Sequence, residues 1–370
     1  MSEYLVVGGG VVGLWSALEL ASAGASVTVV ERSTPGAGAT RAAAGILSPT
    51  DPPEWQGPLG EFNRAAIADW PECARELEAR AGAESGYSRR RELRIGDLES
   101  DFVSAASNKG AEFGFEVRVL TRDEASDLAP GAELTDACLL LEPSGSVRTE
   151  ALVDALTRAC RSAGVESVTA EVSRIDPAPD AVRLELADGS ELAAENVLVA
   201  TGAWSGAEGL LDFVPPVSPL VGDGVVLRAD VDASFPLLRT EAGSIVPRDD
   251  GTVWVGTSKR EAGFSTEPDS GTIQTILDRA FAICPSLREA AVERTVAGPR
   301  PMSRDGLPFV GPLGERVVLA TGHGREGIIH APLTAKAIAR GMSSGDWSSI
   351  PAEFRPDAAG RRPAQTAAAG

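Results

Sequence analysis

The N-terminal stretch YLVVGGGVVGLWSALELASAGASVTVVER, residues 4–32, constrains the fold of this chain more than any other part of the sequence. An apolar run leads into Gly8, Gly10 and Gly13, which have the spacing G-x-G-x-x-G. A helical pattern follows, and then a second apolar run that ends at Glu31. This order predicts a strand, a tight turn, a helix and a second strand, the arrangement in which α/β proteins bind dinucleotides.

The glycines and the acid suit a ligand that contains a pyrophosphate. Gly8 lets the chain reverse after the strand, Gly10 lets phosphate approach the backbone, and Gly13 lets the helix pack closely on the strand. The phosphate is expected at the helix N-terminus, where free N–H groups and the helix dipole favour an anion. Glu31 lies about 20 residues beyond the motif, where an acid accepts hydrogen bonds from ribose hydroxyls. Because this carboxylate would repel a 2′-phosphate, NADP is not expected.

Length, net charge and cysteine content limit the kinds of protein and partner that are expected. The 370 residues suffice for two domains with a large core, and the formal net charge of −19 argues against nucleic acid and anionic membranes as partners. No apolar run reaches the roughly 20 residues of a membrane span, and no signal peptide is visible. The four cysteines show no C-x-x-C spacing and are expected to be reduced thiols in a cytoplasmic protein: Cys73, Cys138, Cys160 and Cys284.

Strand and helix patterns alternate along the chain without a long linker, so two consecutive domains are not expected. Elements typical of a nucleotide domain recur at 195–204 and 316–324, whereas the stretches between carry more hairpin signals. The prediction is an α/β protein with a Rossmann-like nucleotide domain and an inserted antiparallel-sheet substrate domain. The expected ranges are 1–86, 142–214 and 300–345 for the nucleotide domain, 87–141 and 215–299 for the inserted domain, and 355–370 for a disordered tail.

Three further segments carry chemical signals. TPGAGATRAAAGILSP, residues 34–49, is dense in small residues that let backbone approach a flat ring system. VVLATGHGREG, residues 317–327, leads from a strand into a helix whose N-terminus could stabilise negative charge on a reduced flavin. Arg300 lies between two prolines, which would hold its guanidinium ready for a carboxylate. The alternatives are a flexible loop, an ordinary strand-to-helix turn and a surface arginine paired with an acid.

In this order, the motifs resemble the D-amino acid oxidase superfamily, and within it the glycine oxidases, over residues 4–341. The resemblance implies a glutathione-reductase-type FAD-binding domain, and FAD is expected to be non-covalent because no cysteine lies near Gly322. It also implies that Arg300 holds the substrate carboxylate and that Arg325 lies nearby. The residues that the resemblance places at FAD are Gly8, Gly10, Val12, Gly13, Glu31, Arg32, Thr40, Arg41, Ala43, Ala44, Gly45, Val172, Thr201, Gly202, Gly322, His323, Gly324, Arg325, Glu326, Gly327 and Ile328.

The implied reaction is oxidative deamination of glycine or another small amino acid or amine. The α-carbon hydride passes to flavin N5, the imine hydrolyses to an oxo acid and ammonia, and dioxygen reoxidises the flavin to give hydrogen peroxide. Little acid–base machinery is needed if the amine binds neutral, which suits a chain with two histidines. His330 is expected in helix packing or at the surface, and His323 near the flavin. A homo-oligomer of two or four subunits is also implied.

Three features depart from the glycine oxidase pattern. The loop at 322–327 reads GHGREG, where an aromatic residue followed by R-N-G is usual. Ser244 stands where a tyrosine typically faces the substrate, and Lys259 stands where an apolar pocket residue is usual. A wider and more cationic pocket would follow. One hypothesis is therefore an acidic or N-substituted amino acid whose second anionic group pairs with Lys259. The alternative is that Lys259 points to solvent and Ser244 is a neutral replacement.

Two other functions remain open at this point. One is a dehydrogenase of the same fold that passes electrons to a quinone or a carrier protein. Its reduced flavin would reoxidise slowly in air, whereas an oxidase would consume oxygen. The other is a flavin-binding protein without turnover, against which the intact RPMSRDGLP segment around Arg300 speaks.

Overall fold

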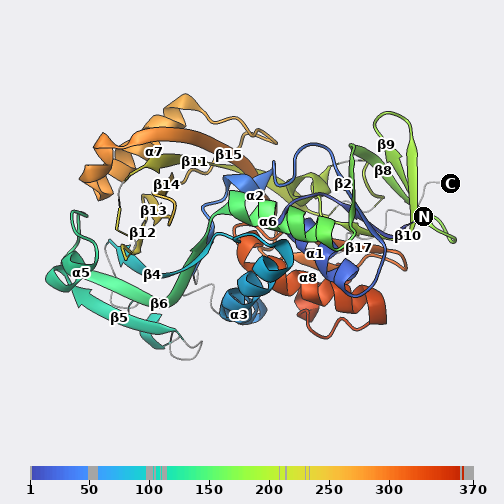
Figure 1. Ribbon diagram of the computed structural model, residues 1–370, viewed down its shortest axis with the longest axis horizontal. Coiled ribbons are helices and arrows are strands. Elements are labelled where there is room, and N and C mark those ends of the chain that lie inside the picture. Colours follow the sequence, from blue (N-terminus) through green and yellow to red (C-terminus); the bar gives the residue numbers. More distant parts are fainter. Residues whose placement is uncertain are drawn as a thin grey trace.

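Two β-sheets, each in its own lobe, organise the chain (Figure 1). The computed structural model describes residues 2–48, 57–96, 103, 106–108, 110, 115–207, 209–212, 215–229, 231–232, 234–358 and 361. The first sheet and the helices packed on it form the lobe on the right of Figure 1, and the second sheet forms the lobe on the left. The chain crosses between them several times, since strands of the two sheets alternate along the sequence.

The first sheet is mostly parallel, as the N-terminal motif predicts. Its parallel strands lie in the order β17, β10, β1, β2 and β7, and β16 pairs antiparallel with β17 at one edge. Two further strands, β8 and β9, continue antiparallel from β10. The bounds are β1 Ser2–Val7, β2 Val27–Glu31, β7 Glu166–Thr169, β8 Val172–Pro177, β9 Val182–Leu186, β10 Glu191–Val199, β16 Phe309–Pro312 and β17 Val317–Thr321.

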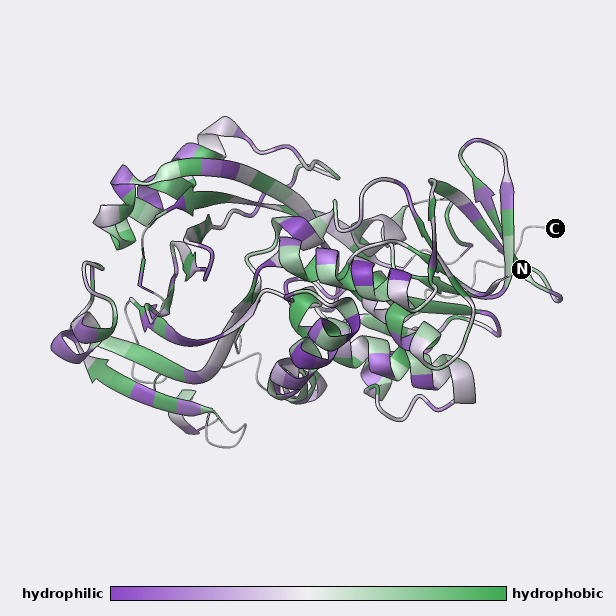
Figure 2. Ribbon diagram, viewed as in Figure 1, coloured by the Kyte–Doolittle hydropathy of each residue, from purple (hydrophilic) through white to green (hydrophobic). Residues whose placement is uncertain are grey.

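Both faces of this sheet are covered, which explains its continuous apolar strands. Tyr4 and Val6 of β1 pack in one core with four helices, whereas Leu5 and Val7 pack in another with residues of β8 and β9. The amphipathic pattern of α6 appears as purple and green bands along its ribbon in Figure 2. The four helices are α1 Val11–Ser22, α3 Gly57–Ala81, α6 Thr149–Ser162 and α8 Gly327–Ser344.

The second sheet is largely antiparallel, and one of its faces is covered by helices. Its order is β15, β11, β14, β13, β12, β4, β6 and β3, with β5 paired to β6 and a single parallel contact between β12 and β4. Alternate residues such as Leu93, Ile245 and Val255 share one core with α7 and α5. The bounds are β3 Ile46–Leu47, β4 Tyr87–Ile95, β5 Glu116–Thr121, β6 Ala137–Val147, β11 Val217–Arg228, β12 Leu237–Thr240, β13 Gly243–Pro247, β14 Thr252–Gly256, β15 Ala291–Ser303, α5 Arg122–Leu128 and α7 Ser270–Ile283.

Short helical turns connect these layers. They are α2 Ala39–Ala42, η2 Gly202–Gly206, η3 Pro285–Glu289 and η4 Ala352–Phe354.

The α/β class with an inserted antiparallel sheet agrees with the prediction, but the boundaries between the lobes differ from it in detail. β3 lies inside the range 1–86 and yet pairs with β6 in the second sheet. β15 belongs to the second sheet and continues past residue 300 to Ser303. Long strands therefore carry the chain from one lobe to the other, and sequence patterns do not mark such a crossing.

The C-terminal segment differs from the disordered tail predicted for 355–370 in the part that the structure describes. The guanidinium of Arg361 donates to the carbonyl oxygens of Pro308 at 2.8 Å and Leu307 at 2.7 Å. It also lies 3.7 Å from the ring centroid of Phe309, so this arginine is anchored beside β16. Low apolar content predicted disorder, but a planar guanidinium can pack on an aromatic ring. Residues 359–360 and 362–370 lie outside the described residues.

Candidate active site

The carboxyl ends of three adjacent parallel strands meet at one edge of the first sheet. Val7 pairs with Val199, and Val199 pairs with Leu319, so the segments after β1, β10 and β17 lie side by side. A cavity of about 1240 Å³ opens there and extends to the inner face of the second sheet. Ligands of doubly wound sheets bind in this kind of crevice.

The glycine motif is built for close packing. Gly8 has φ +110°, and a Cβ added to it would lie 2.4 Å from the carbonyl oxygen of Ala200. A Cβ on Gly13 would lie 2.0 Å from the carbonyl oxygen of Gly8. Gly8 therefore permits the reversal that ends β1, and Gly13 lets α1 pack onto that turn, as the sequence predicts for both.

Polar side chains fix the entrance of α1 and the end of β2. The carboxylate of Glu31 accepts hydrogen bonds from the backbone N–H groups of Gly9 at 2.7 Å and Ser33 at 3.0 Å. The hydroxyl of Thr40 accepts from the N–H of Val11 at 3.1 Å, within the first turn of α1. Glu31 and Thr40 both line the cavity. The carboxylate at the end of β2 and the N-terminus of α1 thus face one space, which fits the nucleotide half of FAD.

Most of the predicted site residues lie on this cavity. Two helix N-termini, those of α1 and α8, and the small residues of 43–45 contribute to its wall. The volume suits a dinucleotide with room for a small substrate. The predicted residues that line it are Gly8, Gly10, Val12, Glu31, Arg32, Thr40, Ala43, Ala44, Gly45, Val172, Thr201, Gly202, Ser244, Lys259, Arg300, His323, Gly324, Arg325, Glu326, Gly327 and Ile328.

Three residues predicted at FAD do not line the cavity: Gly13, Arg41 and Gly322. For Arg41 the side-chain contacts point away from the cavity and correct the prediction. Its Nε donates to the carbonyl oxygen of Pro35 at 2.9 Å, and its Nη2 pairs with Asp154 of α6 at 2.9 Å. Consecutive residues of a helical turn point about 100° apart, so Thr40 faces the cavity while Arg41 faces α6. Gly322 has φ +73° and forms the turn behind the lining.

Arg300 is seated on the inner face of the second sheet. Its Nη1 donates to the carbonyl oxygen of Ser258 at 3.2 Å, and its Nη2 donates to the hydroxyl of Thr257 at 2.7 Å. A Cβ on Gly222 would lie 2.0 Å from Nη2, so the guanidinium occupies space that only a glycine leaves. Burial, and then the charge of Arg325, lower the pKa of Arg300. Within the described residues no carboxylate forms an ion pair with Arg300, and its charge is left for a ligand.

Asp223 holds the segment on which Arg300 rests. This fully buried carboxylate accepts from Nε and Nη2 of Arg260, each at 2.8 Å, and from the hydroxyl of Ser258. Its own carbonyl oxygen accepts from the Thr257 hydroxyl at 3.1 Å. Burial raises the pKa of Asp223, but the bonds from Arg260 and Ser258 outweigh burial and keep the pKa low. Since Arg260 pairs with this carboxylate, Asp223 positions the seat without forming an ion pair with Arg300.

The histidines are buried and neutral. Burial lowers the pKa of His323 to about 4, and burial together with the charge of His323 lowers the pKa of His330 well below its ordinary value. Nε2 of His330 lies 2.6 Å from Oδ1 of Asn63 in α3, which confirms a packing role. His323 lines the cavity and its Nε2 lies 3.4 Å from the hydroxyl of Thr334. Neither supplies a positive charge to the site near pH 7.

Several residues that sequence reasoning missed also line the cavity. Trp204 of η2 does so, with the guanidinium carbon of Arg32 3.7 Å from its ring centroid. Trp254 of β14 lies against Gly224 and Gly256, and Arg94 and Arg239 line the inner face of the second sheet. Trp204 lies two residues after the ATG of 200–202, and this position in the sequence could have indicated its place at the cavity. The arginines carried no such signal, because strand pairing brings them to the site.

The part of the chain that the structure describes shows no candidate metal site and no membrane-spanning helix. No group of histidine, cysteine and acidic residues there could hold a metal ion. The four cysteines are free and buried, as predicted, and none of them lines the cavity. Among the described helices, none has the length and apolar character that a membrane crossing requires.

A dinucleotide crevice that opens onto an arginine seated for a carboxylate defines a class, the flavin-dependent oxidoreductases. Comparison with known families makes this specific: residues 3–340 match the family described as DAO, FAD dependent oxidoreductase. The chain belongs to this family, and FAD is its cofactor.

Individual relatives agree. The chain is 30% identical over 350 residues to glycine oxidase from Geobacillus kaustophilus (strain HTA426), covering 91% of this chain and 92% of that protein. The crystal structure of glycine oxidase from Geobacillus kaustophilus matches with a TM-score of 0.87 at 28% identity, covering 96% and 98% of the two chains. Iminodiacetate oxidase from Chelativorans sp. BNC1 shares the fold, with a TM-score of 0.85 at 24% identity and coverage of 95% and 98%. This chain is therefore a flavoenzyme similar to glycine oxidase.

Proposed function

We propose that this enzyme oxidatively deaminates glycine or another small amino acid, with dioxygen as the electron acceptor. Amino acid, dioxygen and water would give an oxo acid, ammonia and hydrogen peroxide. The observation that carries the proposal is Arg300, a cavity arginine with two neutral hydrogen-bond partners and no carboxylate paired to it in the described residues. Glycine oxidases among the relatives support the reaction class.

The cavity divides between cofactor and substrate. Glu31, Thr40 and the N-terminus of α1 would hold the dinucleotide, and the N-terminus of α8 lies at the same crevice. FAD supplies a hydride acceptor when it is bound. Arg300 would bind the α-carboxylate through two parallel hydrogen bonds, which orients the α-carbon.

The amine is expected to react in its neutral form. His323, with a pKa of about 4, is uncharged near pH 7, so the positive charge near the substrate amine comes from arginines. A cationic wall that contains Arg300 and Arg325 favours loss of a proton from that ammonium group. The reaction therefore needs positioning more than a dedicated base. A cytoplasmic location is part of the proposal and is supported by four free, buried cysteines.

The test is the visible spectrum of the purified holoenzyme without oxygen, before and after adding glycine. Bleaching of the oxidised-flavin bands and their rapid return in air, with one hydrogen peroxide per glycine consumed, would support the oxidase. Bleaching followed by slow return in air, with rapid return on adding a quinone, would assign a dehydrogenase instead. If glycine and other small amino acids all leave the bands unchanged, the proposal is wrong. Arg300→Leu is the matched variant and should bleach far more slowly at the same glycine concentration.

A further inference from the structure

A second cationic group lines the cavity on the inner face of the second sheet. Arg239 of β12 pairs in register with Arg94 of the parallel strand β4, and on its other side with Ser244 of β13. Ser244 in turn pairs with Gly256 of β14. Residues opposite each other on neighbouring strands lie on the same face of a sheet, and the first three of these line the cavity. Two arginines, a serine and a glycine therefore form one row across the sheet.

Glu92 holds the two arginines of this row. It is fully buried on β4, on the same face as Arg94. Nε of Arg94 donates to its Oε1 at 2.6 Å, Nε of Arg239 lies 3.4 Å from the same oxygen, and the hydroxyl of Ser48 bonds to Oε2. Burial raises the pKa of Glu92, but the charges of Arg239 and Arg94 outweigh burial and keep the pKa low. Glu92 thus contacts both guanidinium groups through one carboxylate oxygen.

Arg239 keeps hydrogen-bonding capacity for a ligand. Its contact with Glu92 uses Nε, and its two terminal nitrogens have no bonded partner among the described residues. Its side chain is 21% exposed and lines the cavity, so a ligand there can reach it. Glu241 also lines the cavity but forms no ion pair with Arg239 in the described part of the chain.

Arg239 and the seat of Arg300 lie two strands apart on the second sheet. Nη2 of Arg300 bonds to Thr257, the residue after Gly256, and Gly256 and Arg239 are separated only by the strand of Ser244. Two strand spacings amount to about 10 Å between main chains. The short side chain of Ser244 leaves the space between the two guanidinium groups less filled than a large residue would.

We propose that Arg239 binds the second carboxylate of a dicarboxylic amino acid whose α-carboxylate is bound by Arg300. This rests on the proposed function and names its substrate class. The sequence had suggested Lys259 for this role. Lys259 lines the cavity, but it is exposed, and no described residue holds its ammonium group in place. Arg239, in contrast, is oriented by a buried carboxylate, and a guanidinium can bind a carboxylate with two hydrogen bonds.

The kinetic test uses a matched pair of amines, N-(carboxymethyl)glycine and N-methylglycine, which differ by one carboxylate. The wild-type holoenzyme should prefer the dicarboxylate in kcat/KM by at least tenfold. Arg239→Gln should remove that preference while changing kcat/KM for N-methylglycine less than threefold, and Arg239→Lys should restore part of it. Arg118→Gln, which removes an exposed charge from β5, is the control. The proposal is overturned if the wild type shows no preference, or if Lys259→Ala removes the preference and Arg239→Gln does not.

A binding measurement separates this inference from the proposed function. Titration of the oxidised holoenzyme with succinate and with propionate, followed by the flavin spectrum and calorimetry, requires no turnover. Succinate should bind at least tenfold more tightly than propionate to the wild type and about equally to Arg239→Gln. If this holds while no amino acid bleaches the flavin, the arginine site stands and the oxidase proposal fails. If both acids bind alike to the wild type while glycine bleaches the flavin, the oxidase stands and the second site is rejected.

Discussion

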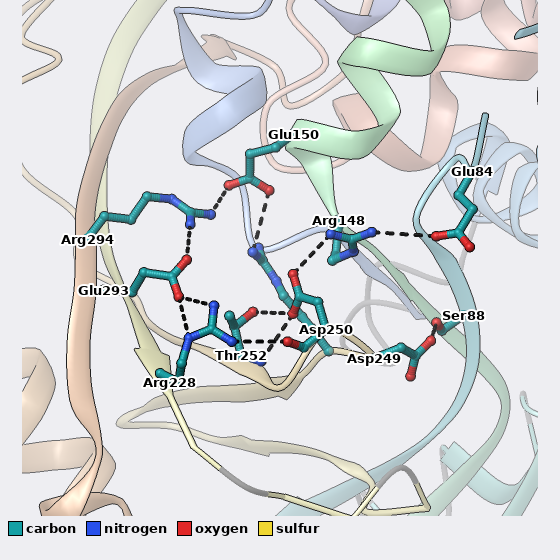
Figure 3. Close-up of polar contacts among 11 residues, drawn as sticks. Glu84, Ser88, Arg148, Glu150, Arg228, Asp249, Asp250, Thr252, Glu293 and Arg294 are labelled. Carbon is teal, nitrogen blue, oxygen red and sulfur yellow. Dashed lines mark hydrogen bonds and ion pairs between the residues drawn. The ribbon is translucent and has the colours of Figure 1, made fainter.

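Arg300 in the cavity and the arginines around the first turn of α6 differ in what balances their positive charge. In the cavity, Arg300 has a hydroxyl and a carbonyl oxygen as partners. Around the first turn of α6, shown in Figure 3, every arginine meets a carboxylate: Glu150 bonds to Arg294 and Arg248, Glu293 bonds to Arg294 and Arg228, and Asp250 bonds to Arg148. Arg300 has no carboxylate paired to it in the described residues, whereas each of these arginines around α6 pairs with one.

The difference separates a site from a structural brace. Charges that the protein itself pairs hold elements together, and here they tie α6 of the first lobe to β15 and to the turn after β13 in the second. A charge that is held in place but not paired costs folding free energy, which a ligand anion can recover. Removing an arginine should therefore lower activity in one region and stability in the other.

Arg300→Leu should give the largest effect. We expect kcat/KM for every amino acid substrate to fall about 1,000-fold, which corresponds to about 4 kcal/mol, because the α-carboxylate loses its charged partner. The melting temperature should stay the same or rise, since an unpaired guanidinium no longer has to be desolvated. Steady-state kinetics and thermal unfolding of the same holoenzyme preparation measure both. A large fall in melting temperature would mean that Arg300 is a structural residue.

Glu150→Gln should show the opposite pattern. Arg248 is 7% exposed, its Nε and Nη2 have no hydrogen-bond partner in the described residues, and Glu150 supplies its nearby negative charge. Losing that charge should lower the free energy of unfolding by about 3 kcal/mol. The kcat/KM of the folded enzyme should change less than threefold. Urea unfolding checks this, with Glu116→Gln on β5 as a surface control. Equal stability of both variants would show that the network in Figure 3 contributes little.

Gly222→Ala sharpens the comparison because it keeps the positive charge of Arg300 but shifts the position of the guanidinium. The new Cβ would lie 2.0 Å from Nη2 of Arg300 and 2.2 Å from its Cζ, so the guanidinium must shift. A flexible side chain can move without disturbing the sheet, and the melting temperature should change little. Misplacement of the α-carboxylate should lower kcat/KM about 30-fold, or about 2 kcal/mol. Gly314→Ala, whose Cβ meets nothing within 4 Å, is the matched control. An unchanged kcat/KM would argue that Arg300 does not fix the substrate.

The nucleotide half of the site was predictable because its information is local. The segment from Gly8 to Glu31 is one continuous strand, turn, helix and strand, and each glycine has a steric reason that can be read from spacing. The segments after β10 and β17 could also be predicted to line the cavity, because small residues directly after apolar strands mark the same edge of a parallel sheet. The bond between Gly9 and the Glu31 carboxylate closes this local unit.

The substrate half was predictable only at Arg300, Arg325, Ser244 and Lys259, where a family resemblance supplied positions. Arg239 and Glu92 meet through a parallel pairing of β12 with β4, two strands far apart in sequence. Register of this kind is set by tertiary packing, and a shift of one residue would turn both side chains to the other face. Glu92 and Arg94 alternate with Leu93 and Ile95, a pattern that also suggests a solvent-exposed face rather than a cavity wall.

The buried histidines are ionisable groups that stay neutral in the folded protein instead of being paired. The smallest predicted effect on stability concerns one of them. His323, with a pKa near 4, stays neutral when folded, whereas the unfolded chain takes up a proton near pH 6.5. Between these values the unfolded state binds more protons, so stability falls as the pH falls. His323→Gln should reduce the loss between pH 7.5 and 5.5 by about 1 kcal/mol, measured by urea unfolding in saturating FAD. If the variant and the wild type lose stability equally, the pKa of His323 is not lowered by folding, and below about pH 6.5 the cavity would carry a further positive charge.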